Sequence, residues 1–375
     1  MKNVAHPLKV LMVTPRYFPY VGGTETHVHE VGPRLAERGI HVTILTTIAN
    51  PDDYDRLPHE ETVEGMRVIR VRAWPAQRDY YYTSEIRSYI KKSNWDLVHC
   101  QGSHTFVPIL AMLAAKQMHI PYVVTFHTGG HTSHIRNMLR SVQWHSLRPL
   151  LAGASRLIAV SRFEKEYFRD TLHLPEDQFS LAPNGFIPLS HDPELLTPPP
   201  STGSLIVSVG RLERYKGHHK LIAALPFIRE RCPDAHVLIL GSGPYETALR
   251  ELAQKYGVAD HVEIRSIPPH ERQTMMQLLS QASVVTLLSE YESQGIVVME
   301  ALALRRPVLV TDTSALHEFA EQRLVCAIPL KSDSEQIAQA VLKQIHHPIL
   351  PVNFSLPTWD ECADKLFTIY QQATS

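Results

Sequence analysis

Leu205–Val209 (LIVSV) runs directly into residues 210–217 (GRLERYKG), and this junction of an apolar pentapeptide with a basic turn decides the fold. A short, almost wholly apolar run is typical of a strand covered on both faces, as in a parallel sheet. Runs of this kind recur along the chain and alternate with segments of helical periodicity. The alternation predicts an α/β fold built on parallel sheets.

The apolar runs fall into two sets on either side of a linker. Residues 183–204 are rich in Pro and Ser, which is a linker composition, so we predict two domains. Ligands of open parallel sheets bind at the carboxyl ends of the strands, which predicts a cleft where these ends face each other. The predicted strands are residues 10–13, 42–45, 97–100, 122–124 and 157–160 in the first domain and 205–209, 237–240, 284–288 and 308–310 in the second.

Three other segments have recognisable patterns. A helix is predicted after the first strand, because Val28, Val31 and Leu35 recur at helical spacing. Residues 63–69 are predicted to form an exposed hairpin inserted between strands. Residues 358–372 are predicted to be helical, and their pattern assigns them to neither domain.

Composition excludes several classes of protein. The 375 residues carry a net charge of −1, with a pI near 7.1, which is unlike the basic excess of nucleic-acid-binding proteins. The 4 cysteines form no CxxC pair and are expected to be reduced thiols. No apolar run reaches the roughly 18 residues of a membrane span, and the first residues lack the pattern of a signal peptide. We therefore expect a cytoplasmic protein.

The basic loop (residues 210–217) combines three cations, Arg211, Arg214 and Lys216, with flanking glycines at a predicted strand end. Such a loop suits a diphosphate, because an Arg binds two oxygens at once and a Lys supplies a mobile charge. Each charge-assisted hydrogen bond contributes about 1.5–3 kcal/mol. Arg211 and Lys216 are therefore predicted to stabilise a departing diphosphate without a metal ion. A solvated basic turn is the alternative.

The acidic loop (residues 289–295, SEYESQG) leads into an apolar helix. Carboxylates accept hydrogen bonds from pairs of hydroxyl groups, which is how proteins hold ribose and sugar rings. Glu292 and Glu300 are candidates for these contacts. Because Glu300 lies within an apolar run, its carboxylate needs a partner. The alternative to a binding role is a structural ion pair with Arg305 or Arg211.

Two predicted helix starts are candidate anion sites. Gly22 and Gly23 follow the first predicted strand, and Thr24 is a suitable N-cap for the helix after them. The second helix is predicted to begin near Gly295, with the amides of residues 294–296 facing an anion. Free amides and the helix dipole favour phosphate at such positions. A tight turn with a capped helix is the alternative for the Gly22-Gly23 pair.

His127 ends another predicted strand and is therefore expected to point into the ligand cleft. A histidine there can polarise or hydrogen-bond a reacting group. The chain has 22 histidines, and most lone histidines are structural. The nearby His131, His134 and His145 suggest a metal site, but no cysteine or carboxylate completes a ligand set. No bound metal is predicted.

Taken together, these motifs resemble one family. Glu292 and Glu300 are separated by seven residues, as in the E-x7-E motif of retaining glycosyltransferase family 4, and the basic loop resembles the diphosphate-binding loop of that family. The similarity covers nearly the whole chain. Further motifs follow the family's order: Gly22-Gly23 with Glu25 and His27, Phe126-His127, Val160-Ser161, Pro183-Asn184-Gly185 and Gly241-Ser242-Gly243-Pro244.

The resemblance implies a GT-B fold, in which two Rossmann-like domains face each other across a cleft. Residues 1–187 would bind the acceptor and residues 188–356 the donor, with a C-terminal helix (residues 357–375) crossing back to the first domain. It implies a retaining transfer of a hexose from a nucleotide diphosphate sugar, of UDP or GDP, to a glycan, a lipid-linked or a small-molecule acceptor. No metal or other cofactor would be needed.

The resemblance also implies roles for single residues. Arg211 and Lys216 would bind the diphosphate, Glu300 the ribose and Glu292 the donor sugar. His127 would lie near the reacting carbon, and Gly243 and Ile267 would line the base pocket. The implied catalytic residues are His127, Glu292, Arg211 and Lys216, and the implied donor-binding residues are Gly22, Gly23, Arg211, Lys216, Gly243, Ile267, Glu292, Ser293, Gln294, Gly295, Ile296 and Glu300.

Three departures from the family concern the shape of the sugar pocket. Gln294 stands where many relatives have Phe, and Arg305-Arg306 stands where many have Cys-Gly. Residues 314–318 (SALHE) keep only the glutamate of the family's Gly-Gly-x-Pro-Glu loop. We therefore assign no particular donor sugar from the sequence.

Other functions were weighed against this interpretation. A sugar-nucleotide epimerase shares the two-domain architecture, but the E-x7-E motif with the basic loop argues against it. Residues 53–55 (DYD) could serve a metal-dependent transferase, yet a polar turn explains them better. A non-catalytic sugar-nucleotide-binding protein would be expected to have lost Arg211, Lys216 or Glu300.

The acceptor is not identified by the sequence. Residues 128–145 and 74–82 are individual to this chain and are the candidate acceptor loops. Tyr80, Tyr81 and Tyr82 are expected to stack on a sugar, to touch a lipid surface as a peripheral membrane contact, or simply to pack. No oligomeric state is indicated.

Overall fold

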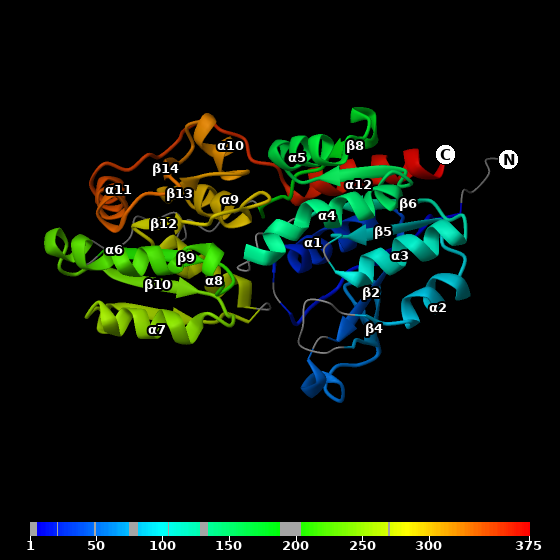
Figure 1. The fold of residues 1–375 in the computed structure, drawn as a ribbon, viewed down its shortest axis with the longest axis horizontal. Helices are drawn as coiled ribbons and strands as arrows, with labels where there is room; N and C mark the ends of the chain where they lie inside the picture. Colours follow the sequence, from blue (N-terminus) through cyan, green and yellow to red (C-terminus); the bar gives the residue numbers. More distant parts are fainter. Residues whose placement is uncertain are drawn as a thin grey trace. The chain divides into compact units, whose positions relative to one another are not determined.

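The computed structural model describes residues 6–20, 22–48, 50–74, 82–103, 105–127, 134–187, 204–268 and 271–375, with the backbone alone for residues 134–142. The chain forms two compact units (Figure 1). Unit 1 comprises Met1–Thr128, Met138–Gly185 and Pro357–Ser375, and the main part of unit 2 is Phe186–Leu356. Each unit is built on one mainly parallel sheet, which confirms the predicted α/β class.

The sheet of unit 1 has the strand order β3-β4-β2-β1-β5-β6-β7-β8. Neighbouring strands run parallel except for β3 and β4. The order reverses direction between β1 and β5, so the loops after these two strands diverge and leave room for a ligand. The strands are β1 (Lys9–Val13), β2 (His41–Ile48), β3 (Glu60–Val63), β4 (Met66–Arg72), β5 (Leu97–Gln101), β6 (Tyr122–Thr125), β7 (Arg156–Ala159) and β8 (Phe179–Leu181).

The predicted hairpin at residues 63–69 exists, but it is not an exposed insertion. β4 pairs with β3 on one side and runs parallel to β2 on the other, and most of its residues are buried. Arg70 is 3% exposed, because its guanidinium pairs with Glu61 at 2.6 Å and donates to the carbonyl of Phe18 at 2.9 Å. The prediction was wrong because an arginine neutralised inside the fold cannot be told from an exposed one by sequence.

The sheet of unit 2 is wholly parallel, with the order β11-β10-β9-β12-β13-β14. Counted along the chain, this is the 3-2-1-4-5-6 order of a doubly wound nucleotide-binding sheet. The predicted strand Leu205–Val209 is confirmed as β9. The others are β10 (His236–Leu240), β11 (Val262–Arg265), β12 (Val284–Leu287), β13 (Val308–Asp312) and β14 (Cys326–Pro329).

Helices connect the strands in both units (Figure 1). Val28, Val31 and Leu35 are fully buried on the first of them, as their spacing predicts. None of the described helices combines the length and the apolar character of a bilayer span. In unit 1 they are α1 (Gly23–Glu37), α2 (Glu85–Lys92), α3 (Phe106–Gln117), α4 (His134–Leu151), α5 (Arg162–Leu172) and α12 (Trp359–Thr374), and in unit 2 α6 (His218–Arg231), α7 (Glu246–Lys255), α8 (Arg272–Ser280), α9 (Ile296–Ala303), α10 (Leu316–Glu321) and α11 (Ser334–His346).

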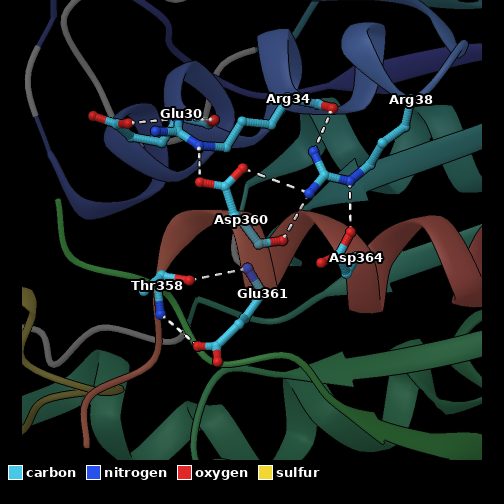
Figure 2. A network of polar contacts seen from close by, with 7 residues as sticks. All are labelled: Glu30, Arg34, Arg38, Thr358, Asp360, Glu361 and Asp364. Atoms are coloured by element: carbon cyan, nitrogen blue, oxygen red, sulfur yellow. Dashed lines mark hydrogen bonds and ion pairs between the residues drawn. The ribbon is translucent and has the colours of Figure 1, made fainter. Parts of the chain in front are cut away.

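The last helix, α12, belongs to unit 1 and packs against α1. Figure 2 shows Arg38 between Asp360 and Asp364, with its Nε donating to Asp364 at 2.7 Å. Ion pairs at such an exposed site contribute roughly 0–1 kcal/mol each. They therefore orient α12 more than they stabilise it.

The buried face of α12 provides most of its attachment. Trp359, Leu366 and Tyr370 are at most 1% exposed, and each buried side chain of this kind contributes about 1.5–3 kcal/mol. Thr358 and Glu361 cap the helix reciprocally, as Figure 2 shows, which satisfies two amides that would otherwise lack partners. The final helix is thus an integral part of unit 1.

Candidate functional site

In unit 2 the basic and acidic loops follow β9 and β12, the two strands between which the strand order reverses. Parallel neighbours end at the same edge of a sheet, so both loops leave from one edge, side by side. Ligands of doubly wound sheets bind at this reversal point. The structure therefore places the two principal sequence motifs of unit 2 at one position.

Gly217 allows the basic loop to lie close to the end of β12. Its φ of 77° is in the left-handed region, and it separates the short helix η4 (Arg214–Lys216) from α6. A Cβ at this position would be 2.0 Å from the carbonyl oxygen of Leu288. Only glycine combines this conformation with this approach. This close approach of Gly217 to Leu288 places the preceding residue, Lys216, beside the acidic loop.

The Lys216 ammonium group contacts the Glu292 carboxylate. Its Nζ is 2.7 Å from Glu292 Oε1, and the hydroxyl of Ser289 donates to the same oxygen at 2.7 Å. The two charged side chains are 17% and 11% exposed. Burial alone would lower the pKa of Lys216, but the attraction of Glu292 outweighs it and the pKa is raised. Lys216 is therefore a cation throughout the neutral range.

Arg211 is more exposed than Lys216. Its side chain is 38% exposed, and its Nη2 lies 3.3 Å from Glu213 Oε1. An ion pair this long at an exposed position is weak. The guanidinium can therefore turn toward an anion at little cost.

Glu300 is buried on α9, which begins after Gly295 as predicted. The carboxylate is 3% exposed, and its Oε1 lies 2.5 Å from Nη2 of Arg272 on α8. Glu300 thus forms a structural ion pair, but with Arg272 rather than with Arg305 or Arg211, the partners considered from the sequence. Because Arg272 is 27% exposed, the pair reaches the surface at its cationic end.

Gln294 lies near the end of the acidic loop, just before α9, and is buried. Its amide nitrogen is 3.7 Å from the sulfur of Met299, so the side chain is directed along α9. The backbone N–H of Glu292 donates to the Ser314 hydroxyl at 2.8 Å, which anchors the loop. The four residues at the helix start (Ser293, Gln294, Gly295 and Ile296) therefore belong to an anchored segment. Their contacts with a donor stay a prediction.

Gly243 and Ile267 follow β10 and β11, on the same side of the sheet reversal as β9. A Cβ at Gly243 would lie 2.6 Å from the carbonyl oxygen of Leu212, so the two loops are in direct backbone contact. Ile267 packs against the apolar core of unit 2. The assignment of both residues to a base pocket stays a prediction.

In unit 1 the Gly22-Gly23 pair opens α1, but the predicted cap is wrong. Gly22 occupies the N-cap position and Thr24 lies inside the helix. The Glu25 carboxylate folds back over the helix start, since a Cβ at Gly22 would be 2.4 Å from its Oε2. Arg16 balances this charge at 3.2 Å. An anion at this helix start would meet a carboxylate already neutralised by Arg16.

His127 follows β6 in an unusual backbone conformation. Its φ is 45°, a value that non-glycine residues adopt mainly at functional or strained positions. The ring is 7% exposed, and its Nε2 lies 2.8 Å from Oε1 of Gln101, at the end of the adjacent strand β5. The fold thus fixes the orientation of this histidine through both its backbone and its side chain.

Two more buried histidines lie near this site, one packed against His127 and one against Gln101. The ring of His27 lies 4.6 Å from it, edge to face, and its Nδ1 is 2.7 Å from the amide oxygen of Asn184. The Nδ1 of His99 is 2.5 Å from the hydroxyl of Tyr370 on α12. Burial lowers the pKa of His27 to about 4 and lowers that of His99 as well. Both rings are therefore neutral near pH 7.

Acid is expected to destabilise the fold because of these histidines. Burial also lowers the pKa of His218, in unit 2, to about 4. Between this value and the ordinary 6.5, the unfolded chain binds more protons than the folded one. The free energy of unfolding should therefore fall as the pH falls from about 6.5 toward 4, by about 1–3 kcal/mol for each ring. Urea denaturation at several pH values measures this loss.

Two variants isolate the contribution of His218. His218→Gln should lose less stability between neutral pH and about pH 4.5 than the unmodified protein, whatever its stability at neutral pH. His41→Gln, which replaces an exposed histidine, should keep the full loss. An equal acid loss in all three proteins would refute the assignment.

Metal binding finds no support in the described part of the chain, where no three His, Cys, Asp or Glu side chains cluster suitably. Asp53 instead accepts a hydrogen bond from Tyr20 at 2.7 Å, in the polar turn that the sequence predicts. His131, Tyr80 and Tyr81 lie outside the described residues, as does the side chain of His134. Predictions that involve them stay predictions.

Two families match the chain in succession. The family described as Glycosyltransferase Family 4 matches residues 21–188, and Glycosyl transferases group 1 matches residues 197–355. The phosphatidyl-myo-inositol mannosyltransferase of Mycolicibacterium smegmatis is 30% identical over 320 residues, which cover 82% of this chain and 77% of that protein. The chain is a family 4 glycosyltransferase.

Solved structures confirm the GT-B fold of this glycosyltransferase. Sucrose-phosphate synthase from Thermosynechococcus elongatus superposes with a TM-score of 0.72 at 21% identity, covering 97% of this chain and 94% of that one. Anabaena HepE, solved in complex with UDP and glucose, superposes with a TM-score of 0.69 at 17% identity, covering 98% and 94%. At these identities the likeness establishes the fold alone.

The sequence analysis did not identify three residues that contact the candidate residues of this glycosyltransferase: Gln101, Ser289 and Arg272. Gln101 carries the same signal as His127, a polar residue at the end of an apolar strand, and could have been found by it. Ser289 immediately follows a predicted strand and could likewise have been noted as a donor to Glu292. Arg272 gave no signal, because its link to Glu300 arises only from the packing of α8 on α9.

Proposed function

We propose that this glycosyltransferase moves a hexose, with retention of configuration and without a metal ion, from a UDP- or GDP-sugar to a carbohydrate, a lipid-linked or a small-molecule acceptor. The observation that carries the proposal is the contact between Lys216 and Glu292, beside Arg211, at the strand-order reversal of unit 2. A cation for a diphosphate and an acceptor for sugar hydroxyls are both needed at the point where the sugar joins its leaving group.

Donor binding would separate Lys216 from Glu292, because each would contact a different part of the substrate. The diphosphate oxygens would draw Lys216 and Arg211, while the Glu292 carboxylate would accept hydrogen bonds from the sugar hydroxyls. Glu292 stays oriented during the exchange because Ser289 also holds it. Charge that develops on the departing diphosphate is then met by the two cations that already contact it, which is an effective form of electrostatic catalysis.

The proposed chemistry exchanges one bond at the anomeric carbon for another. The bond from this carbon to the diphosphate oxygen breaks, and a bond to the acceptor hydroxyl oxygen forms on the same face of the ring. The departing phosphate takes the proton of that hydroxyl. Neither a nucleophilic side chain nor a metal ion is required by this route.

Remaining residues would bind the other parts of the substrates. Glu300 would hold the ribose hydroxyls, and Gly243 and Ile267 would border the base. His127 of unit 1 would contact the donor sugar near the reacting carbon. We assign the acceptor to unit 1, whose candidate loops fall partly outside the described residues.

Isothermal titration with UDP, GDP, ADP and dTDP tests the donor class, followed by a transfer assay with the corresponding hexose donors. Transfer is expected to continue in excess EDTA, because Arg211 and Lys216 supply the positive charge. Loss of transfer in EDTA, with recovery on adding magnesium, would overturn metal independence. Analysis of the anomeric configuration of the product checks retention, and release of an altered sugar nucleotide with no acceptor product would indicate an epimerase instead.

A further inference from the structure

The His127 side chain belongs to a buried series of polar contacts that crosses unit 1. The hydroxyl of Tyr370 on α12 meets His99, on β5, at 2.5 Å. The amide nitrogen of Gln101, two residues further on β5, lies 3.3 Å from the ring nitrogens of His99, and its amide oxygen faces Nε2 of His127 at 2.8 Å. His99, Gln101 and Tyr370 have no exposed surface.

We propose that Gln101 is a positioning residue of this glycosyltransferase: it holds the His127 ring in one orientation with the proton on Nε2. The inference deepens the proposed function and rests on it, since it concerns the histidine assigned to the donor sugar. Gln101 itself has no contact with substrate in this proposal. It acts only through His127.

The chemistry of an amide oxygen fixes the tautomer. A carbonyl oxygen accepts and never donates, so a contact of 2.8 Å with Gln101 Oε1 requires a proton on Nε2 of His127. In the neutral ring, Nδ1 then carries the lone pair. That nitrogen can accept a hydrogen bond from a sugar hydroxyl, whereas a ring protonated at both nitrogens cannot.

The backbone at His127 fixes where the side chain leaves the end of β6. His127 has a φ of 45°, and such a conformation persists only where the surroundings determine it strongly. His127 follows β6, and the neighbouring strand β5 ends at Gln101, which pairs with Thr125 of β6. The ring of His127 therefore lies beside the end of β5. Backbone and amide together leave the ring a single orientation.

Two titratable groups near His127 among the described residues are neutral near pH 7. His27 packs against its ring from α1, and His99 lies behind Gln101 on β5. Gln101 Oε1 lies 2.8 Å from Nε2 of His127, so exchanging the amide for a carboxylate acts directly on the proton of this nitrogen. Replacing the amide by a carboxylate should therefore have a defined effect.

Gln101→Glu tests this effect with almost no change of shape. A carboxylate facing Nε2 favours the doubly protonated ring, so the pKa of His127 should rise by about one unit or more. The acid side of the kcat/KM profile should move to higher pH by the same amount. Above the new pKa, activity should return toward that of the unmodified enzyme.

Gln101→Leu removes the acceptor altogether. With it kcat should fall about tenfold or more, while KM for the donor changes less than threefold, because orientation is lost rather than binding. Tyr122→Phe is the matched control: it removes a buried hydrogen bond of 2.6 Å to the Leu150 carbonyl from β6, the strand that leads to His127. This control should lower the urea midpoint without moving the pH profile or kcat.

Long-range 1H–15N spectra of the imidazole ring give a readout that needs no activity, with the signal of His127 assigned by its absence in His127→Asn. Protonation at Nε2 in the unmodified protein, a mixture of tautomers in Gln101→Leu and a raised pKa in Gln101→Glu are expected. A proton on Nδ1, or an unchanged pKa in Gln101→Glu, would overturn the inference. These spectral results with no transfer from any sugar nucleotide would instead overturn the proposed function.

Discussion

Replacing Lys216 with alanine is expected to lower kcat/KM for the sugar nucleotide by about 100-fold or more. The substitution removes a charge that we propose to meet the departing diphosphate, and groups of this kind contribute about 3–4 kcal/mol to the transition state. It also leaves the Glu292 carboxylate mostly buried without the ammonium group that now lies 2.7 Å away. Most of the loss should therefore appear in kcat, measured by steady-state transfer assays.

Lys220→Ala is the matched control for this prediction. Lys220 lies one helical turn further, on α6, and its Nζ donates to the carbonyl of Leu330 at 3.2 Å rather than to the acidic loop. Its removal should change kcat/KM less than threefold. Because Lys216 and Glu292 act as one pair, the losses of Lys216→Ala and Glu292→Ala should combine to much less than their product. Equal effects of Lys216→Ala and Lys220→Ala would contradict the role given to the basic loop.

Replacing Glu300 with alanine should weaken donor binding by about 10- to 150-fold, the range that corresponds to about 1.5–3 kcal/mol for hydrogen bonds to a charged group. The proposed ribose contact is made by the nucleotide alone, so free UDP or GDP should lose the same factor. Isothermal titration measures this directly. The kcat at saturating donor should change much less than it does in Lys216→Ala.

Arg272→Ala separates the binding role of Glu300 from its ion pair. If Glu300 served only to neutralise Arg272, removing either partner would have similar consequences for nucleotide affinity. We expect Arg272→Ala to lower the urea midpoint while changing nucleotide affinity less than about fivefold. Removing Arg272 leaves the Glu300 carboxylate, which is 3% exposed, without this cation, so the stability lost should be about 3–5 kcal/mol. Similar losses of affinity in both variants would leave Glu300 a structural residue.

Much of the fold was predictable because its central strands are apolar on both faces. Leu205–Val209 was predicted without error, since the three central residues of β9 are buried and a glycine ends the strand. β11 and β8 were missed because they lie at sheet edges, where strands are short and partly exposed. β4 was misjudged for a different reason, the neutralised charge of Arg70. The formation of edge strands and the burial of charged residues depend on contacts with distant segments, which the local sequence does not reveal.

The site was predictable in its residue types but not in its pairings. Lys216 and Glu292 were each recognised from a strand-end motif, yet their contact depends on the sheet order that brings β9 next to β12. The partner of Glu300 came from α8, a helix without any motif. Gln101 meets His127 only because β5 and β6 are neighbours. Contacts between distant segments are properties of the topology.

The attachment of α12 to unit 1 has a consequence for the order of events during synthesis. The ribosome makes residues 186–356, all of the main part of unit 2, before it makes the helix that supplies Trp359 and Tyr370 to unit 1. Until then, His99 lacks its tyrosine and the α1 face that α12 covers is open to water. The domain translated first is thus the one completed last, and a nascent chain stalled after unit 2 would present this uncovered face to chaperones.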